Sequence, residues 1–193
     1  MKRACLSVLI ALVAFVASPT ILRAQVQAQA GPTPDPQAYD DPAMHFRAPT
    51  GFVGLGQRPI SVDKLGEDPQ IVAGWVYPDK DHPRRLALQQ EYYEGDVSGF
   101  DAVLEGQMRD QFQGAVFKNK KNTTLRNGMP AMFVEMTSGE GFNVQKAYVL
   151  LWADGQRGVA LVLMTQLNDI SADTARQLLS DVTAVRYPVG RSQ

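Results

Sequence analysis

Apolar and polar positions along the chain fall into strand-like and helix-like segments in a defined order. Short strands are predicted at 45–48, which leads into a proline and a glycine, and at 60–65. The runs 70–77 and 85–93 are predicted to form a hairpin across a loop rich in proline and aspartate. Four further strands are predicted at 123–126, 130–137, 142–152 and 157–166, with Asn-Gly and Asp-Gly turns among them.

Two segments switch to a helical period. In residues 99–112 the apolar positions form one stripe, and Ser98 is predicted as the N-cap. The members of this stripe are Phe100, Val103, Leu104, Met108 and Phe112. A second helix is predicted over 172–185, capped by Ser171 and with an inward stripe that includes Ala175 and Leu179.

The last two strands carry apolar side chains on both faces. Val149 and Leu151 alternate with Leu150 and Trp152, so neither face of this strand is polar. A sheet that is apolar on both faces needs a cover on each. The sequence therefore predicts an α+β fold, a three-layer α/β/α sandwich with a central, mainly antiparallel sheet.

The N-terminus has the pattern of a secretory signal peptide. Lys2 and Arg3 precede the apolar run 4–17, and Ala24 supplies a small residue for cleavage. Cleavage after Ala28 or Ala30 also fits, and an uncleaved membrane anchor is the alternative. The predicted organisation is a signal peptide at 1–24, a flexible linker rich in Gln, Ala and Pro at 25–42, a folded domain at 43–188 and a tail at 189–193.

Composition narrows the classes of function. The chain has 193 residues, a formal net charge of -1 and 45% hydrophobic residues, which describes a globular domain without a basic field for nucleic acid. The one cysteine, Cys5, lies within the predicted signal peptide. The processed chain would then have no disulfide, no zinc–thiolate site and no cysteine nucleophile.

A family resemblance emerges from these segments. The run Phe46-Arg47-Ala48-Pro49-Thr50-Gly51-Phe52, the helix after Gly95-Asp96-Val97-Ser98-Gly99-Phe100 and the turn Asn127-Gly128 are similar to the PsbP-like superfamily, which includes the Mog-type proteins, over roughly residues 44 to 187. Phe52 stands where a tryptophan is usual, and the end 184–187 lacks the usual Ser-Phe. The resemblance implies an α/β sandwich and a non-enzymatic, exported, bacterial-type member. Since the superfamily shares no catalytic motif, it assigns no functional residue.

Candidate chemistry is sparse. His45 and His82 are the two histidines, and no Gly-x-Ser-x-Gly elbow accompanies them. Asp79, Asp81 and His82 offer oxygen and nitrogen atoms to a cation but lack the spacing of a calcium loop. Glu91 and Glu94 are expected to face water on opposite sides of a strand end. The sequence therefore predicts no catalytic residue, no metal site and no cofactor.

Aromatic and basic residues are the remaining candidates for contacts with a partner or ligand. They are Trp75, Tyr77, Tyr92 and Tyr93 on the first hairpin, and Lys118, Lys120 and Lys121 after the first helix. The alternative interpretation is that the aromatics fill a layer under a helix and that the lysines lie in a solvated loop.

The sequence favours an exported, periplasmic or secreted, non-catalytic binding or accessory module that engages another envelope or secreted protein. It predicts no nucleic-acid partner and no membrane span after cleavage. One alternative is a small-molecule carrier or sensor, which predicts an apolar cavity between sheet and helix. A second is an unrecognised hydrolase, which predicts His45 or His82 within hydrogen-bond reach of a serine or a carboxylate.

Overall fold

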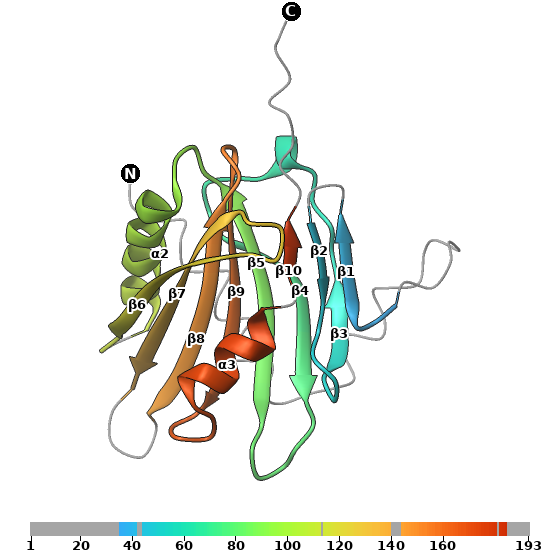
Figure 1. The fold of residues 1–193 in the computed structure, drawn as a ribbon, viewed down its shortest axis with the longest axis vertical. Helices are drawn as coiled ribbons and strands as arrows, with labels where there is room; N and C mark the ends of the chain where they lie inside the picture. The colour runs from blue at the N-terminus through green and yellow to red at the C-terminus, as the bar shows by residue number, and fades with distance from the viewer. Residues whose placement is uncertain (1–34, 42–43, 113, 140–143, 181, 185–193) are drawn as a thin grey trace, which may run out of the picture. The chain divides into compact units, whose positions relative to one another are not determined.

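A computed structural model describes residues 35–41, 44–112, 114–139, 144–180 and 182–184 of the chain (Figure 1). The predicted signal peptide, most of the predicted linker and the C-terminal tail lie outside these residues. All of the described residues except Asp35 belong to one compact unit, which begins at Pro36. This unit starts earlier than the predicted boundary at residue 43, because strand β1 (Ala38–Asp41) pairs with β2 (Met44–Arg47).

A seven-stranded antiparallel sheet dominates the fold, in the order β3-β4-β5-β9-β8-β7-β6. Gly128 and Gly155 have positive φ in the turns between β6 and β7 and between β8 and β9, as the Asn-Gly and Asp-Gly signals predicted. The strands are β3 (Val53–Gln57), β4 (Gln70–Tyr77), β5 (Arg84–Tyr92), β6 (Val116–Thr124), β7 (Pro130–Ser138), β8 (Gln145–Ala153) and β9 (Arg157–Gln166), and a short 3-10 turn η2 (Val62–Lys64) precedes β4.

Helix α2 (Val97–Gln111) covers one face of this sheet over β7 and β8. Its N-cap is Asp96, two residues earlier than the predicted Ser98, since the Asp96 side chain accepts a hydrogen bond from the Gly99 amide at 2.8 Å. Phe100, Leu104 and Met108 of the predicted stripe are buried against the sheet, whereas Val103, which was predicted to face inward with them, is 41% exposed. Any side chain at Gly158 of β9 would overlap the Phe100 ring, so the helix depends on a glycine beneath it.

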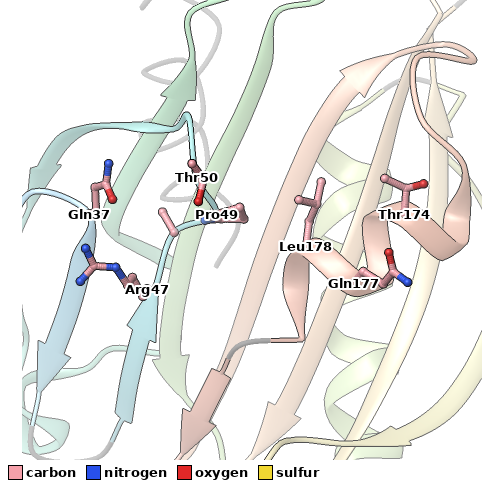
Figure 2. A pocket seen from close by; sticks show the side chains of 8 residues that line it. Gln37, Arg47, Pro49, Thr50, Thr174, Gln177 and Leu178 are labelled. Atoms are coloured by element: carbon pink, nitrogen blue, oxygen red, sulfur yellow. The ribbon is translucent and has the colours of Figure 1, made fainter.

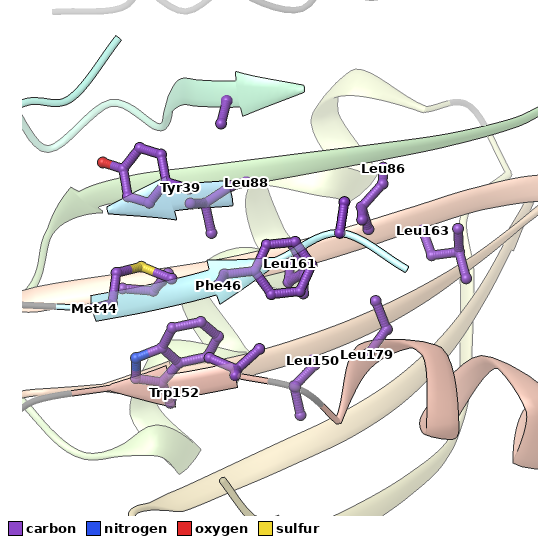
Figure 3. Close-up of a cluster of buried hydrophobic side chains, with 14 of the residues drawn as sticks. Tyr39, Met44, Phe46, Leu86, Leu88, Leu150, Trp152, Leu161, Leu163 and Leu179 are labelled. Atoms are coloured by element: carbon purple, nitrogen blue, oxygen red, sulfur yellow. The ribbon is translucent and has the colours of Figure 1, made fainter. Parts of the chain in front are cut away.

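The opposite face is covered by helix α3 (Ala172–Leu179) and by a small sheet of order β1-β2-β10. Figure 3 shows Tyr39, Met44 and Phe46 of the small sheet packed with Trp152 and Leu161 of the large one. Trp75 lies fully buried in the same layer, edge-on to Phe46 at 5.2 Å between ring centroids.

The observed layers agree in part with the sequence prediction. The central antiparallel sheet, the helices and the two apolar faces are present. One cover, however, is largely a second sheet rather than a helix. The predicted helix 172–185 ends at Leu179, and β10 (Val182–Ala184) pairs with β2 instead. The predicted lysine loop is also wrong, because Lys118, Lys120 and Lys121 belong to strand β6 at an edge of the sheet.

A buried guanidinium joins the two sheets. Arg157 is 1% exposed and contacts Asp41 of β1 at 3.2 Å and Asp154 at 2.8 Å. Tyr39 donates to Asp41 at 3.0 Å, and Gln90 of β5 donates to the same carboxylate at 3.2 Å. Burial, and next the charge of Asp41, raises the pKa of Tyr39, so its phenol stays protonated and remains a donor.

Replacing Arg157 tests this connection. Arg157→Met would leave the buried carboxylates of Asp41 and Asp154 without their cation, and we expect it to lower the free energy of unfolding by about 3–5 kcal/mol. Urea denaturation at neutral pH measures the change. Lys80→Met removes a cation from the exposed Lys80–Asp81 pair and should cost less than ~1 kcal/mol. Equal effects of the two variants would contradict the assigned role.

Candidate functional site

A hollow of about 390 Å³ lies between the small sheet and helix α3 (Figure 2). Arg47, Thr50 and Gln37 stand on one side of it, and Thr174 and Gln177 of α3 stand on the other. Ala48, Pro49 and Leu178 supply apolar surface. A volume of this size is within the range of small-molecule sites, and its wall is mixed in polarity.

The turn after β2 shapes one wall of the hollow. The Ala48 amide donates to the Gln37 carbonyl at 2.8 Å, and the Phe52 amide donates to the Pro49 carbonyl at 3.2 Å. Gly51 sits inside this turn with φ of 92°, and a Cβ there would lie 2.7 Å from the Tyr77 ring. The turn therefore needs glycine for its backbone conformation and for the approach of the ring.

Helix α3 shapes the other wall. The Ser171 side chain accepts from the Thr174 amide at 3.1 Å, which confirms the predicted N-cap. Ala175 and Leu179 are buried against the large sheet. The helical period then turns the side chains of Thr174, Gln177 and Leu178 toward the hollow, as Figure 2 shows.

The chemistry of the hollow is that of hydrogen bonding rather than acid–base work. Its lining offers one guanidinium, two amides and two hydroxyl groups, together with three apolar side chains. Amides and hydroxyls both donate and accept, so this set matches a peptide backbone or another polar ligand. The apolar cavity that the carrier hypothesis predicted is not what this lining provides, although the place between sheet and helix is the predicted one.

Both histidines contact carboxylates. His82 lies 3.0 Å from Asp169, and His45 lies 2.6 Å from Asp40. This meets the carboxylate criterion of the hydrolase hypothesis. Asp169, however, also binds Arg84 at 2.6 Å, and within the described residues no hydroxyl group hydrogen-bonds either imidazole. The pairs therefore lack the nucleophile–base contact of a triad.

In the candidate cation loop, the Asp79 carboxylate binds amides of the loop's own backbone. Asp79 accepts hydrogen bonds from the amides of Asp81 and His82 at 2.8 and 3.0 Å. These bonds lower the pKa of Asp79. In the part of the chain that the structure describes, no three His, Cys, Asp or Glu side chains gather as metal ligands would.

Aromatic residues predicted as contacts take different positions. Trp75 is buried and donates from its indole to the Pro36 carbonyl at 3.0 Å, so it packs the core rather than a partner. Tyr77 is half-buried between Phe52 and Arg84. Tyr93 packs on Phe100. Tyr92 is the exposed member, 37% accessible, and its hydroxyl donates to Glu94.

The three lysines differ as well. Lys118 and Lys121 are exposed on the edge strand β6, where positive charge discourages pairing with another strand. Lys120 instead reaches α2 and contacts Asp101 and Glu105, the latter at 2.7 Å. Burial opposes the charge of Lys120, but the two carboxylates outweigh it and raise its pKa. The structure brings none of the predicted contact residues to the hollow.

Sequence reasoning missed the hollow because its walls come from distant parts of the chain. Arg47 and Thr50 were visible as part of a turn, and Ser171 as a helix cap. Their proximity depends on the pairing of Val182 with Phe46, which the predicted long helix had ruled out. The signal available in the sequence was the pair Ser180-Asp181, at which the predicted helix could have been ended earlier.

Comparisons with known proteins leave the family open. No protein-family model and no curated protein sequence matches the chain, so the PsbP-like resemblance is not confirmed. One similar solved structure is the crystal structure of LpqN, described as involved in cell envelope biogenesis of Mycobacterium tuberculosis. The match covers 75% of this chain and 86% of that chain, with 16% identity and a TM-score of 0.48. A likeness at this level assigns neither a family nor a function.

Among the described ranges, no helix combines the length and apolarity needed to cross a bilayer.

The turn that walls the hollow provides a direct test. Gly51→Ala forces a side chain into positive φ against the Tyr77 ring, and we expect it to cost about 1–3 kcal/mol of stability. Gly106→Ala on helix α2, where nothing lies within 4 Å of an added Cβ, should instead stabilise by up to ~1 kcal/mol. Thermal or urea unfolding compares the two, and a neutral Gly51→Ala would contradict the described turn.

Proposed function

We propose that this chain is an exported, non-catalytic accessory module that binds another envelope or secreted protein through the hollow between β2 and α3. We also propose that its fold is of the PsbP-like, three-layer type that the sequence predicts. The observation that carries it is the make-up of the hollow. Pro49 and Leu178 supply apolar surface, and hydrogen-bonding side chains surround it. Protein interfaces have this anatomy of an apolar centre with a polar rim.

The two walls of the hollow favour an extended segment of a partner as its occupant. Gln37 and Gln177 stand on opposite sides of the hollow. Because Nε2 of Gln37 already donates to the Phe52 carbonyl at 3.4 Å, a partner chain would use the amide of Gln177 on the α3 side. A side-chain amide donates and accepts at once, which matches the alternating groups of a peptide backbone. Leu178 and Pro49 would then contact an apolar side chain of that segment.

A small polar ligand is the second candidate for the same hollow. Its volume of about 390 Å³ favours this alternative. A carrier would hold such a ligand by the same amides and hydroxyls. The two candidates differ in what they predict for cross-linking, since only a protein partner yields a product of larger mass.

Export is supported by the N-terminal pattern of the sequence. The full chain expressed in its host should lose residues 1–24, and intact-mass spectrometry should give a product that starts at Gln25, or at Gln29 or Gly31 for the alternative sites. Leu9→Arg with Leu12→Arg breaks the apolar run and should leave the chain unprocessed. A wild-type chain that retains Met1 would contradict cleavage and favour the membrane anchor.

Site-specific photo-cross-linking tests the binding surface. A benzophenone amino acid placed at Thr50 or at Gln177, on the two walls, should give the same cross-linked partner from the native compartment. Leu178→Glu puts a charge on the apolar surface and should reduce the yield about tenfold, the effect of ~1.4 kcal/mol.

Two further positions serve as matched controls. Val103 is 41% exposed on helix α2 and should give no product. Lys118 samples the lysine edge that the sequence singled out. A cross-linked product at Lys118 but not at Gln177 would place the partner at that edge and contradict binding in the hollow. The absence of any product at all four positions would contradict the protein-binding function.

A further inference from the structure

Glu91 was expected to face water, but the structure buries it beneath helix α2. Its side chain extends from β5 opposite Gly158 of β9, and the residue is 1% exposed. Gln107 of α2 donates from Nε2 to Oε2 of Glu91 at 2.7 Å. This hydrogen bond links β5 to the helix, and β5 lies on the other side of the sheet from β6.

Two oxygen atoms at this contact are left without partners. Among the described residues, neither Oε1 of Glu91 nor Oε1 of Gln107 accepts a hydrogen bond, and both atoms are buried. An unsatisfied buried acceptor is costly, and a buried carboxylate without a cation is more so.

Among the residues that the structure describes, the charged groups around Glu91 do not compensate its negative charge. The nearby charge is Asp68, from the segment before β4, and it is negative. The acids of α2, Asp101 and Glu105, turn to the other flank and bind Lys120. On β9, Arg157 is held by Asp41 and Asp154 within the opposite layer.

We infer that Glu91 and Gln107 form a proton-dependent clasp, in which the carboxylic acid of Glu91 donates from Oε1 to Oε1 of Gln107 and holds α2 on the sheet. One proton removes the buried charge and satisfies both orphaned oxygens. The amide of Gln107 already supplies the second, antiparallel hydrogen bond to Oε2. Loss of the proton leaves a charge and an unpaired amide oxygen under the helix, and this flank of α2 loosens.

The protonation behaviour of Glu91 agrees with this geometry. Burial raises the pKa of Glu91 to about 7, the Gln107 hydrogen bond opposes the rise and the charge of Asp68 adds to it. An unburied glutamate has a pKa near 4.5. Because the closed state binds the proton more tightly than the open state, closure is favoured below about pH 4.5. That advantage is lost as the pH rises to about 7.

The opposite flank of α2 stays fixed over the same range. Lys120 binds Asp101 and Glu105, and its pKa is raised above the ordinary lysine value. The ammonium group of Lys120 therefore stays charged between pH 5 and 8. A rise in pH consequently releases one flank of the helix while the other remains attached to β6.

Amide hydrogen exchange of the full chain tests the clasp. Between pH 5 and pH 8, after correction for intrinsic exchange rates, the open population of α2 should rise on the order of a hundredfold. Glu91→Gln keeps the shape and the pairing with Gln107 but does not titrate, so its open population should stay constant over this range. Carboxyl-carbon NMR should show Glu91 half protonated near pH 7.

Glu135→Gln is the matched control. Glu135 is another buried acid of the same sheet, but Lys146 and Asn119 bind it and its pKa is lowered. This variant should retain the full pH response of α2. The clasp is overturned if the wild-type response is absent, if it persists in Glu91→Gln, or if amides of β8 open to the same extent as those of α2.

Discussion

The buried guanidinium of Arg157 is the interaction on which one whole layer of this protein depends. It stands at the start of β9 and binds Asp154 beside it and Asp41 from β1, far away along the chain. Because a buried cation is tolerated only with its anions in place, the small sheet has one position over the large one. The aromatic layer of Tyr39, Phe46 and Trp75 and the wall of the hollow formed by Arg47 and Thr50 follow from that position.

The two faces of the large sheet are covered by different physical means. On the Arg157 side, most of the contact is apolar and comes from a second sheet and a short helix. On the other side a single helix covers β7 and β8, and polar side chains on each of its flanks set its position. A cover made of one element can move without disturbing the rest, whereas the small sheet is built from strands at the start and at the end of the described residues.

Local signals were sufficient for much of the fold. The apolar runs, the Asn-Gly and Asp-Gly turns and the capped helices predicted most strands and both helices, since each depends on neighbours in sequence. The small sheet could not be derived in this way. β10 has three residues and follows a helical period, and β1 lies in a proline-rich stretch that resembles a linker. The hollow depends on the pairing of β2 with β10, and the burial of Glu91 depends on the contact of β5 with α2. Both bring together residues that are separated along the chain.

The pairing of β2 with β10 also determines when the protein can finish folding. Phe46 lies opposite Val182, so the first and last strands of the described unit form one sheet. During synthesis from the N-terminus, β1 and β2 emerge long before their partner strand β10 has been made. Their apolar faces must wait for almost the entire chain, and closing so long a loop slows folding. A chain whose small sheet is completed only by β10 therefore stays partly unfolded until nearly all of the described unit has been synthesised.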